Sequence, residues 1–395
     1  MLRKLSILLL CFSPSISFAS DFDDVLSTIV SNNLSLKNAV AVDEASIAEM
    51  KAENTLEAPE FSYENLFGAK GIGDKRNFSL SQSFDWPGVY AARSQAVKKS
   101  ESAMQYLRES GVLDLRRDVR VALIDMINIR QQIATTSKIC DGLAAMSEYY
   151  KKASEEGNET RLDYNKAVVE HINAVRELKT LKADSSVIAA TLRDLNGGKE
   201  VKELIARVGL NYPHADLSSL IPERESIRMK DPSVAASRAS IEAQKALVKV
   251  EKRSLLPGFS VAYLHEWEMG DNFNGFSVSV TLPFLTGRSK VKAASMRLAS
   301  QNLDEEMAVI KIYSEMQSDY ETAVELRELL REYRGVMSDD STFELLRKAL
   351  DVGQINFLTY MQELNYFLAA RRDFLEAHYR YHLAVARLQR YESPI

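Results

Sequence analysis

Residues 78–93 read FSLSQSFDWPGVYAAR, and residues 276–288 read FSVSVTLPFLTGR, a close copy almost two hundred positions later. In both stretches, large and mostly apolar residues alternate with small polar ones. This period of two is typical of a β-strand with one apolar face and one polar face. Each strand is followed by a proline, a glycine and a long segment of helical composition. The sequence therefore predicts two joints between strand and helix, at Pro87, Gly88, Pro283 and Gly287.

The two copies belong to a longer internal repeat. Residues 59–62 match residues 257–260, and residues 78–81 match residues 276–279, both at a spacing of 198 positions. Further along, the segment around Gly157 matches the segment around Gly353 at a spacing of 196 positions. A fixed spacing over so long a stretch indicates two repeats of one structural plan.

Each repeat is predicted to hold a helix, two strands and a long helical hairpin. Proline is absent between Pro87 and Pro213 and between Pro283 and Pro394, which leaves room for long helices. The first repeat covers residues 21–198, with strands at 59–67 and 77–86 and a hairpin tip near 157. A linker at 199–231 follows. The second repeat covers residues 232–395, with strands at 257–268 and 274–284 and a tip near 353.

The first twenty residues read as a secretory signal peptide. Arg3 and Lys4 precede an apolar run at 5–12, and the small residues Ser17 and Ala19 supply a cleavage site. Cys11 does not fit a lipidation site, because Leu10 stands where a small residue is needed. The mature chain then keeps only Cys140, so an intramolecular disulfide is excluded.

Composition excludes several classes of function. The formal net charge is -5, with both signs interspersed, so no basic surface for nucleic acid is expected. No run of eighteen apolar residues follows residue 20, so a helical membrane span is not expected. Glycine-rich phosphate loops and hydrolase motifs are missing as well. We therefore expect no enzyme activity and no cofactor.

The strands carry the functional signal. Strands of this length, apolar on one side and ending in aromatic residues, match those of transmembrane barrels. A soluble antiparallel sheet with one wet face gives the same alternation. Export, and the lack of any obvious cover for the apolar face besides the long helices, favour the membrane. The polar set, predicted to line a lumen, is Ser79, Ser81, Ser83, Asp85, Ser277, Ser279 and Thr281.

Four strands cannot close a barrel, and lipid does not tolerate an open sheet edge. A membrane sheet of this kind therefore requires several copies of the chain. In the long helices, narrow apolar stripes at steps of three and four favour coiled-coil packing. The two stripes are Val112, Leu115, Val119, Leu123, Met126, Ile129 and Ile133, and Leu303, Met307, Ile310, Tyr313, Met316, Tyr320 and Val324.

With these features, the chain resembles the TolC family of outer-membrane efflux proteins over essentially the whole mature length. The most specific motifs are SQSFDWPGVYAAR at 81–93, VSVTLPFLTGRSK at 278–290 and the helical segment at 349–391. The ending of the first strand, FDWPGVYAAR, is similar to members of the metal-cation efflux branch.

The resemblance implies a mainly α fold with a transmembrane β-barrel. A homotrimer would form one twelve-stranded barrel in the outer membrane of a Gram-negative bacterium, continuous with a periplasmic tunnel of helices. The linker would form a belt around that tunnel. The hairpins would meet a periplasmic adaptor protein, and with an inner-membrane transporter the three would make a tripartite efflux pump. Outer-membrane lipid is an expected contact, and nucleic acid is not.

The hairpin tips are expected to form the periplasmic aperture. Members of the family often carry acidic residues shortly after the second tip glycine, and this chain does not. We therefore expect Asp163 to supply the charge at the constriction, although a solvated tip residue is the alternative. The candidate aperture residues are Gly157, Glu159, Asp163, Gly353, Gln354, Asn356 and Thr359.

Two alternatives remain open from the sequence. His378 and His382 are four positions apart on a helix and could share a metal ion, but no third ligand with suitable spacing accompanies them, so packing is the preferred interpretation and no metal site is expected. The competing class of protein is a soluble periplasmic coiled-coil scaffold or adaptor, in which the strands form a small capping sheet.

Overall fold

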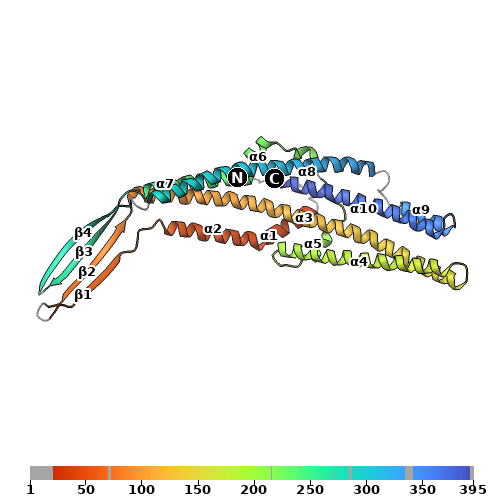
Figure 1. Ribbon diagram of the computed structural model, residues 1–395, viewed down its shortest axis with the longest axis horizontal. Coiled ribbons are helices and arrows are strands. Elements are labelled where there is room, and N and C mark those ends of the chain that lie inside the picture. Colours follow the sequence, from red (N-terminus) through yellow and green to blue (C-terminus); the bar gives the residue numbers. More distant parts are fainter. Residues whose placement is uncertain are drawn as a thin grey trace, which may run out of the picture. The chain divides into compact units, whose positions relative to one another are not determined.

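The computed structural model describes residues 21–69, 73–214, 216–268, 270–283, 287–333 and 341–391. The predicted signal peptide lies outside these residues. Within them the chain is mainly helical and has one four-stranded sheet (Figure 1). The elements are α1 (Asp21–Asn32), α2 (Leu34–Ala52), β1 (Glu60–Leu66), β2 (Lys75–Phe84), α3 (Pro87–Glu155), α4 (Arg161–Leu195), α5 (Lys202–Arg207), η1 (Leu217–Leu220), α6 (Arg224–Lys230), α7 (Pro232–Arg253), β3 (Gly258–Glu268), β4 (Asp271–Thr281), α8 (Gly287–Tyr333), α9 (Ser341–Asp351), α10 (Phe357–Leu388) and η2 (Gln389–Tyr391).

The strands form a single antiparallel sheet in the order β1-β2-β3-β4. Strands β2 and β3, which come from different predicted repeats, pair along ten residues, from Lys75 with Glu268 to Phe84 with Phe259. The two strand pairs therefore join into one continuous surface. Whether the halves are true structural repeats stays a prediction.

The observed bounds of all four strands differ from the predicted ones, by one residue at an end of β1 or β3 and by more in β2 and β4. Strand β2 begins and ends two residues earlier than expected, and β4 begins and ends three residues earlier. Glu268 pairs with Asp271, and Gly270 in this tight connection has φ +99, a backbone region that glycine adopts most readily. At the other end of β2, Pro87 opens α3, so Asp85 lies beyond the strand rather than within it.

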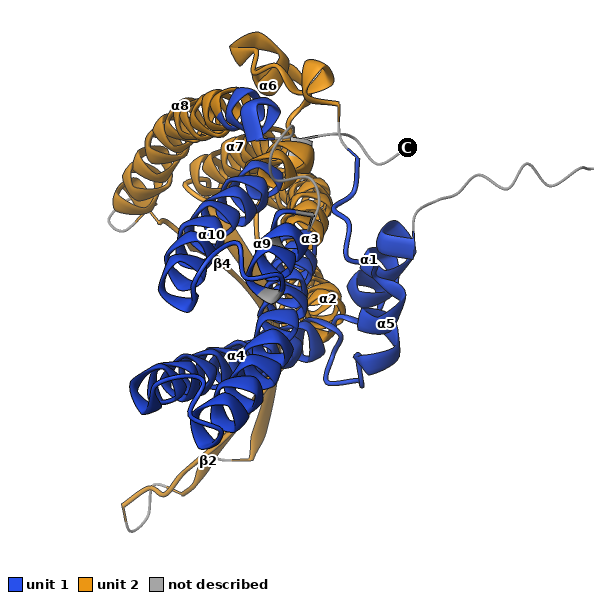
Figure 2. Ribbon diagram, turned by 90° about the vertical axis from the view of Figure 1, so that its right-hand side faces the viewer, with its two compact units in different colours: residues 1–33, 118–215, 326–383 blue, residues 34–117, 216–325, 384–395 orange. Residues whose placement is uncertain are grey.

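The chain forms two compact units, and each takes segments from both predicted repeats (Figure 2). The first unit comprises residues 1–33, 118–215 and 326–383. The second comprises residues 34–117, 216–325 and 384–395, and it contains the sheet. Within the described residues, no helix has both the length and the apolarity needed to cross a lipid bilayer.

In the first unit, α1 packs onto the end of α4. Its buried side chains are Phe22, Val25, Leu26, Ile29 and Val30. The Asn32 side chain donates a hydrogen bond of 2.9 Å to the side chain of Asn196, and Asn33 donates one of 2.9 Å to the Leu195 carbonyl. These bonds satisfy polar groups where α1 ends and α4 ends, so both helix termini are fixed together.

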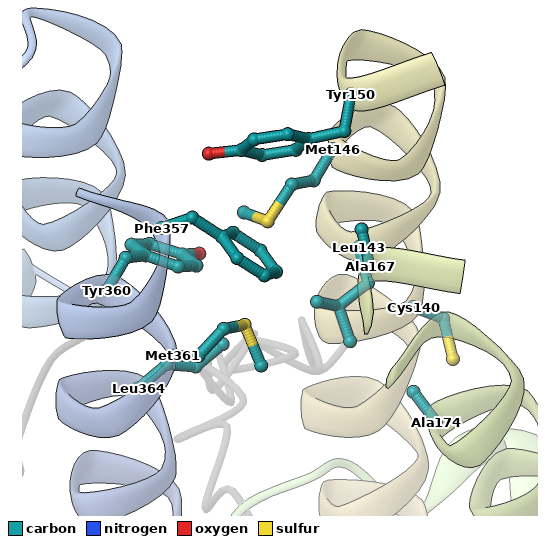
Figure 3. Packing of buried hydrophobic residues seen from close by; sticks show 10 residues of the cluster. All are labelled: Cys140, Leu143, Met146, Tyr150, Ala167, Ala174, Phe357, Tyr360, Met361 and Leu364. Atoms are coloured by element: carbon teal, nitrogen blue, oxygen red, sulfur yellow. The ribbon is translucent and has the colours of Figure 1, made fainter. Parts of the chain in front are cut away.

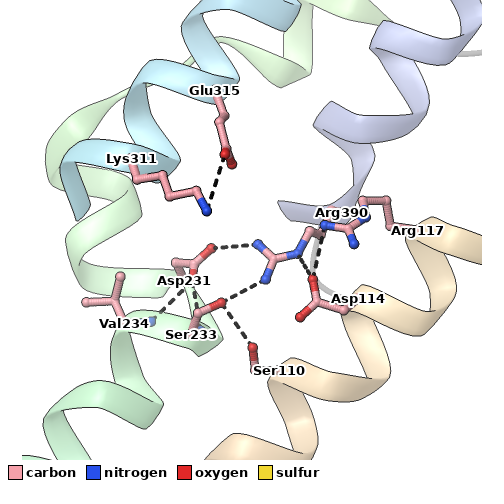
Figure 4. A network of polar contacts seen from close by, with 9 residues as sticks. All are labelled: Ser110, Asp114, Arg117, Asp231, Ser233, Val234, Lys311, Glu315 and Arg390. Carbon is pink, nitrogen blue, oxygen red and sulfur yellow. Dashed lines mark hydrogen bonds and ion pairs between the residues drawn. The ribbon is translucent and has the colours of Figure 1, made fainter. Parts of the chain in front are cut away.

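In the second unit, the C-terminal turn is held by an arginine whose side chain is 9% exposed (Figure 4). Arg390 contacts Asp114 of α3 at 2.7 Å, Asp231 at 3.7 Å and the Ser233 hydroxyl at 2.8 Å. Asp231 also caps α7, because its side chain accepts bonds from the first amides of that helix. One side chain thus joins three segments distant in sequence.

The two predicted coiled-coil stripes differ in burial. On α3, Val119 and Leu123 are fully buried. On α8, Leu303 is 62% exposed and Met307 is 59% exposed, whereas Met316 is buried. The other side of α8 meets α7, through the bond from Gln244 to the Ala294 carbonyl and the ion pair of Arg238 with Glu305. Much of the α8 stripe is therefore uncovered in the single chain, and its coiled-coil packing stays a prediction.

Candidate functional site

Each helical hairpin of the first unit turns at a glycine in the left-handed backbone region. Gly157 has φ +79 and Gly353 has φ +73. The amide after each glycine bonds back into the preceding helix, from Asn158 to the Ala153 carbonyl at 2.8 Å and from Gln354 to the Ala349 carbonyl at 2.9 Å. These bonds satisfy the last carbonyls of α3 and α9 and reverse the chain within a few residues.

The next helix of each hairpin begins with a side-chain cap. Thr160 accepts a bond from the Asp163 amide at 3.2 Å, and Asn356 accepts one from the Thr359 amide at 2.9 Å. Asp163 and Thr359 therefore hold the same position, third in α4 and third in α10. Both tips are thus built from a glycine turn and an N-cap.

Asp163 is tied into its tip by two further contacts. The Thr160 hydroxyl donates to one carboxylate oxygen of Asp163 at 2.5 Å, and Lys166 contacts the other at 3.3 Å. The bond from Thr160, followed by that from Lys166, holds the pKa of Asp163 below its ordinary value. The carboxylate is therefore charged at neutral pH, and its side chain is 26% exposed.

An apolar cluster lies beside the tips and joins the two hairpins (Figure 3). The ring of Tyr150, from α3, lies 4.6 Å from the ring of Phe357, from α10. The buried members are Cys140, Leu143, Met146, Tyr150, Ala167, Ala174, Phe357, Tyr360, Met361 and Leu364. Cys140 is part of this packing, and burial raises the pKa of its thiol.

A hollow of about 700 Å³ adjoins the cluster at the level of the tips. Its polar lining includes Tyr150, Glu159, Asp163, Lys166, Arg347 and Asn356. Burial, followed by the nearby charge of Glu159, raises the pKa of Tyr150 to about 12. The phenol therefore stays neutral, and the charges of the hollow come from acidic and basic side chains of both hairpins.

The remaining aperture candidates sit at the tip surface. Glu159, Gln354 and Asn356 are exposed, and Thr359 is half-buried. The structure thus brings residues from both tips to one hollow. Sequence reasoning missed the bond between Thr160 and Asp163, although the spacing of Thr160 and Asp163 is that of a capping box and could have indicated it.

The sheet has a polar face of the predicted residues. Directly paired residues of an antiparallel sheet point to the same side. Ser83 pairs with Ser260, which pairs with Ser279. Ser79 and Ser81 lie four and two residues before Ser83 on β2 and therefore point to the same side of the sheet. The face includes Glu60, Ser62, Glu64, Ser79, Ser81, Ser83, Ser260, Ala262, Leu264, Ser277, Ser279 and Thr281. Toward the end where β2 begins it continues with the charged residues Lys75, Glu266, Glu268 and Asp271.

The opposite face is apolar and exposed. Phe276 is 80% exposed and Val278 is 70% exposed. Rings pack across the strands, with Phe84 and Phe259 5.3 Å apart and Tyr263 and Phe276 5.6 Å apart. An exposed apolar surface of this extent marks an interaction site for lipid or protein.

The first joint, at Pro87 and Gly88, is fixed by hydrogen bonds. Pro87 takes the first position of α3, where its missing N–H costs nothing. Arg253, at the end of α7, donates to the Gly88 carbonyl at 2.8 Å. Asp85 forms an ion pair of 2.8 Å with Arg93 on the first turns of α3. Asp85 therefore takes part in the joint. It lies just after the end of β2, which carries the polar serines.

The second joint depends on close packing. The Gly287 amide donates to the Pro283 carbonyl at 3.1 Å and begins α8. A Cβ atom placed on Gly287 would overlap with the Leu255 side chain. A larger residue here would force the Leu255 side chain to move, a contact that the sequence did not indicate.

The histidine pair packs against an aromatic side chain from the linker. The Tyr212 ring stacks on His382 at 4.4 Å and meets His378 edge-on at 4.9 Å. Burial, followed by the charge of His378 and then of His214, lowers the pKa of His382 to about 3, so this ring is neutral at neutral pH. Among the described residues, no group of three or more histidine, cysteine or acidic side chains is arranged to hold a metal ion.

Comparison with known proteins identifies the fold. No family model matches the chain, and no curated protein matches it either. Among solved structures, the Campylobacter jejuni CmeC outer membrane channel has a TM-score of 0.77 at 15% identity, covering 94% of this chain and 85% of that one. The Vibrio cholerae outer membrane protein VceC has a TM-score of 0.73 at 12% identity, covering 94% of this chain and 95% of that one.

A membrane protein from Pseudomonas aeruginosa is similar to the same degree, with a TM-score of 0.73 at 15% identity, covering 94% of this chain and 92% of that one. The chain thus has the fold of TolC-family outer-membrane efflux channels, and the resemblance predicted from its motifs is confirmed at the level of the fold.

Proposed function

We propose that this chain is one subunit of an outer-membrane channel that serves as the exit duct of a tripartite efflux pump. The observation that carries the proposal is the fold shared with outer-membrane channels over 94% of the chain. The two unlike faces of the sheet support it independently, because a barrel wall needs one polar and one apolar side.

In the proposed assembly, three copies close a twelve-stranded barrel in the outer membrane. Strands β1 and β4 are the edges of the sheet in one chain. Since all neighbouring strands are antiparallel, β4 of one copy can pair with β1 of the next copy in antiparallel fashion. Closure satisfies the edge hydrogen bonds, which lipid cannot do. The polar face then lines the lumen, and the exposed stripe of α8 gains a partner helix.

The hairpin tips are the proposed periplasmic aperture. An adaptor protein would dock there, and an inner-membrane transporter would supply the substrate. That transporter would mainly decide which substrate is exported. Asp163 would place a negative charge at the constriction. Its charge is present at neutral pH, and Lys166 offsets only part of it at a separation of 3.3 Å near the surface.

Membrane fractionation followed by mass measurement in detergent tests the duct. We expect the protein in the outer-membrane fraction, as a trimer, with ion conductance after insertion into planar bilayers. The alternative, a soluble periplasmic scaffold or adaptor, predicts release without detergent and a monomer or dimer. That result would refute the channel.

Single-channel recording of the Asp163→Asn variant tests the aperture. Asparagine keeps an oxygen that can accept the bond from Thr160 and removes the charge. We expect lower cation selectivity and altered conductance. Asp184→Asn, the same change at an exposed site farther along α4, is the matched control. Identical currents in both variants would remove Asp163 from the aperture.

A further inference from the structure

The linker that follows α4 is fastened to α3 by side chains that bond to its backbone. Arg130 of α3 donates a hydrogen bond to the Val208 carbonyl, and the next residue, Gln131, donates one of 2.6 Å to the Leu210 carbonyl. Both bonds end on carbonyl groups of the linker, so α3 holds its main chain rather than its side chains. We call residues 208–212 the strap.

Tyr212 fastens the other end of the strap to α10. Its ring stacks on His382 at 4.4 Å, with 13° between the ring planes, and meets His378 edge-on at 4.9 Å. The row of rings continues from His378 to Phe374, 5.7 Å away. The two histidines are four positions apart and therefore lie on one face of α10. At this end the strap is held by packing of rings.

The hydroxyl of Tyr212 opposes this docked position. Its oxygen is buried, and the described residues give it no hydrogen-bond partner. Tyr379 and Asp125 lie nearby, but the Tyr379 hydroxyl donates to the Asp125 carboxylate at 2.9 Å. A buried hydroxyl without a partner costs free energy. Docking of the strap therefore depends on the stacked rings to offset that cost.

The stack contains a neutral imidazole at His382. Burial, followed by the charge of His378 and then of His214, lowers the pKa of His382 to about 3. Of the neighbouring groups, Tyr212 and His214 belong to the linker, whereas His378 shares the helix of His382. Detachment of the linker would therefore remove both a covering ring and a repelling charge from His382.

The carboxylates around the stack do not offset these effects. Asp125 of α3 and Glu376 of α10 raise the pKa of Tyr212, and neither is among the groups that shift the pKa of His382. The remaining ring beside His382 is that of Tyr381, which meets it edge-on at 4.9 Å. The described residues thus supply no carboxylate that favours a charged His382.

Acid must therefore weaken the docked strap. The ordinary pKa of histidine is 6.5, and the pKa of His382 in the docked state is lower. Once the strap has detached, this pKa returns toward its ordinary value. Docking has its full strength above pH 6.5 and loses it as the pH falls toward the docked pKa. The equilibrium constant for detachment rises by up to about tenfold for each pH unit in this window.

We propose that residues 208–212 form an acid-released strap, in which protonation of His382 detaches Tyr212 from α10 while Arg130 and Gln131 keep the strap on α3. The proton comes from solvent and resides on the imidazole ring, which becomes hydrated when the tyrosine ring leaves. The inference goes beyond the proposed channel and does not depend on it, because all of these contacts lie within one compact unit of one chain.

A single tryptophan in the strap reports detachment directly. Tyr212→Trp is made in the full chain together with Trp86→Phe and Trp267→Phe, so that the only indole is the one that stacks on His382. Quenching of its emission by acrylamide, an uncharged quencher, is measured in detergent from neutral pH down to about pH 4. We expect the detached fraction to grow by up to about tenfold per pH unit below 6.5, with a red shift of the emission. Helix content, measured by circular dichroism, is expected to stay constant.

Replacement of His382 removes the group that titrates. His382→Phe keeps a ring for stacking, and His382→Gln supplies a neutral polar side chain in case phenylalanine disturbs the packing. We expect quenching of the strap tryptophan to be independent of pH in both variants. His171→Phe, which removes a histidine from α4, is the matched control and is expected to keep the full acid response.

The outcomes decide between release of the strap and general effects of acid. Quenching that does not change on acidification would overturn the proposal, and so would an equal rise in the His382→Phe and His382→Gln chains. A rise that appears only together with loss of helix content also contradicts it, because unfolding then exposes position 212. A response that is lost only with His382 supports the strap. The proposed channel is judged separately, by mass in detergent and by conductance.

Discussion

The two hairpin tips have the same backbone and different charges. Gly157 and Gly353 adopt the same left-handed turn, and Thr160 and Asn356 cap the helices that follow. Three residues after the cap, the first tip carries Asp163 and the second carries Thr359. The comparison teaches that the turn and the cap determine the geometry of a tip, whereas its charge can vary without altering that geometry.

The largest expected effect comes from the packing that both tips share. Phe357→Ala removes the ring that lies 4.6 Å from Tyr150 and leaves a cavity between the hairpins. We expect a loss of about 3–5 kcal/mol in the free energy of local opening, since truncation of a buried aromatic ring costs this much. Hydrogen exchange of peptides from both tips in detergent measures it.

The exposed neighbour offers a matched control for this change. Leu358 is 56% exposed, so Leu358→Ala is expected to alter exchange little. Loss of protection in the second tip alone would contradict the view that one cluster supports both tips.

A smaller effect, of equal size at the two tips, is expected when either turn glycine is replaced. Gly157→Ala and Gly353→Ala each force a side chain into the left-handed region, which costs about 1–2 kcal/mol. A Cβ atom at either position would meet nothing within 4 Å, so backbone strain is the whole cause. Clearly unequal changes in exchange at the two tips would show that their backbones are not equivalent.

The smallest expected effect comes from replacing the N-cap residues. Its dependence on pH is expected to differ between the two tips. Thr160→Ala and Asn356→Ala should each cost about 1 kcal/mol at neutral pH, the usual loss for an N-cap. Only the first also frees Asp163, whose carboxylate accepts a bond from Thr160. Exchange of the two tips across a pH series measures both effects.

The direction of the pH dependence follows from the lowered pKa of Asp163. The folded value lies below the ordinary 3.8, so this carboxylate adds stability above that value. The contribution is lost as the pH falls through the folded pKa. We expect the first tip to lose protection at acidic pH, an effect reduced by Thr160→Ala and abolished by Asp163→Asn. An identical acid response in the Asp163→Asn variant would contradict this assignment.

Sequence reasoning reached the features that depend on neighbouring residues. The alternation of residues 78–84 located β2, and the glycines located both turns, because these signals act over a few positions. It missed the early start of β2, since Lys75 joins the sheet through pairing with Leu66 and Glu268. It also missed the ion pair of Asp85 with Arg93, which forms only after the strand has ended.

Contacts between distant segments could not be read from the chain. A Cβ atom on Gly287 would overlap with the side chain of Leu255, and the partner of Phe357 is Tyr150, more than two hundred positions away. Burial of the α3 stripe and exposure of much of the α8 stripe likewise depend on which helix lies beside each. Periodicity marks an apolar face but does not say what covers it.

The sequence by itself determined which residues form strands, where the hairpins turn and which strand face is polar. Those properties follow from local backbone preference and from the side-chain period of each element. Only the tertiary structure decided that β2 pairs with β3 and that one apolar cluster joins both hairpins. These depend on long-range packing, where many segments with suitable faces compete and only the folded chain selects among them.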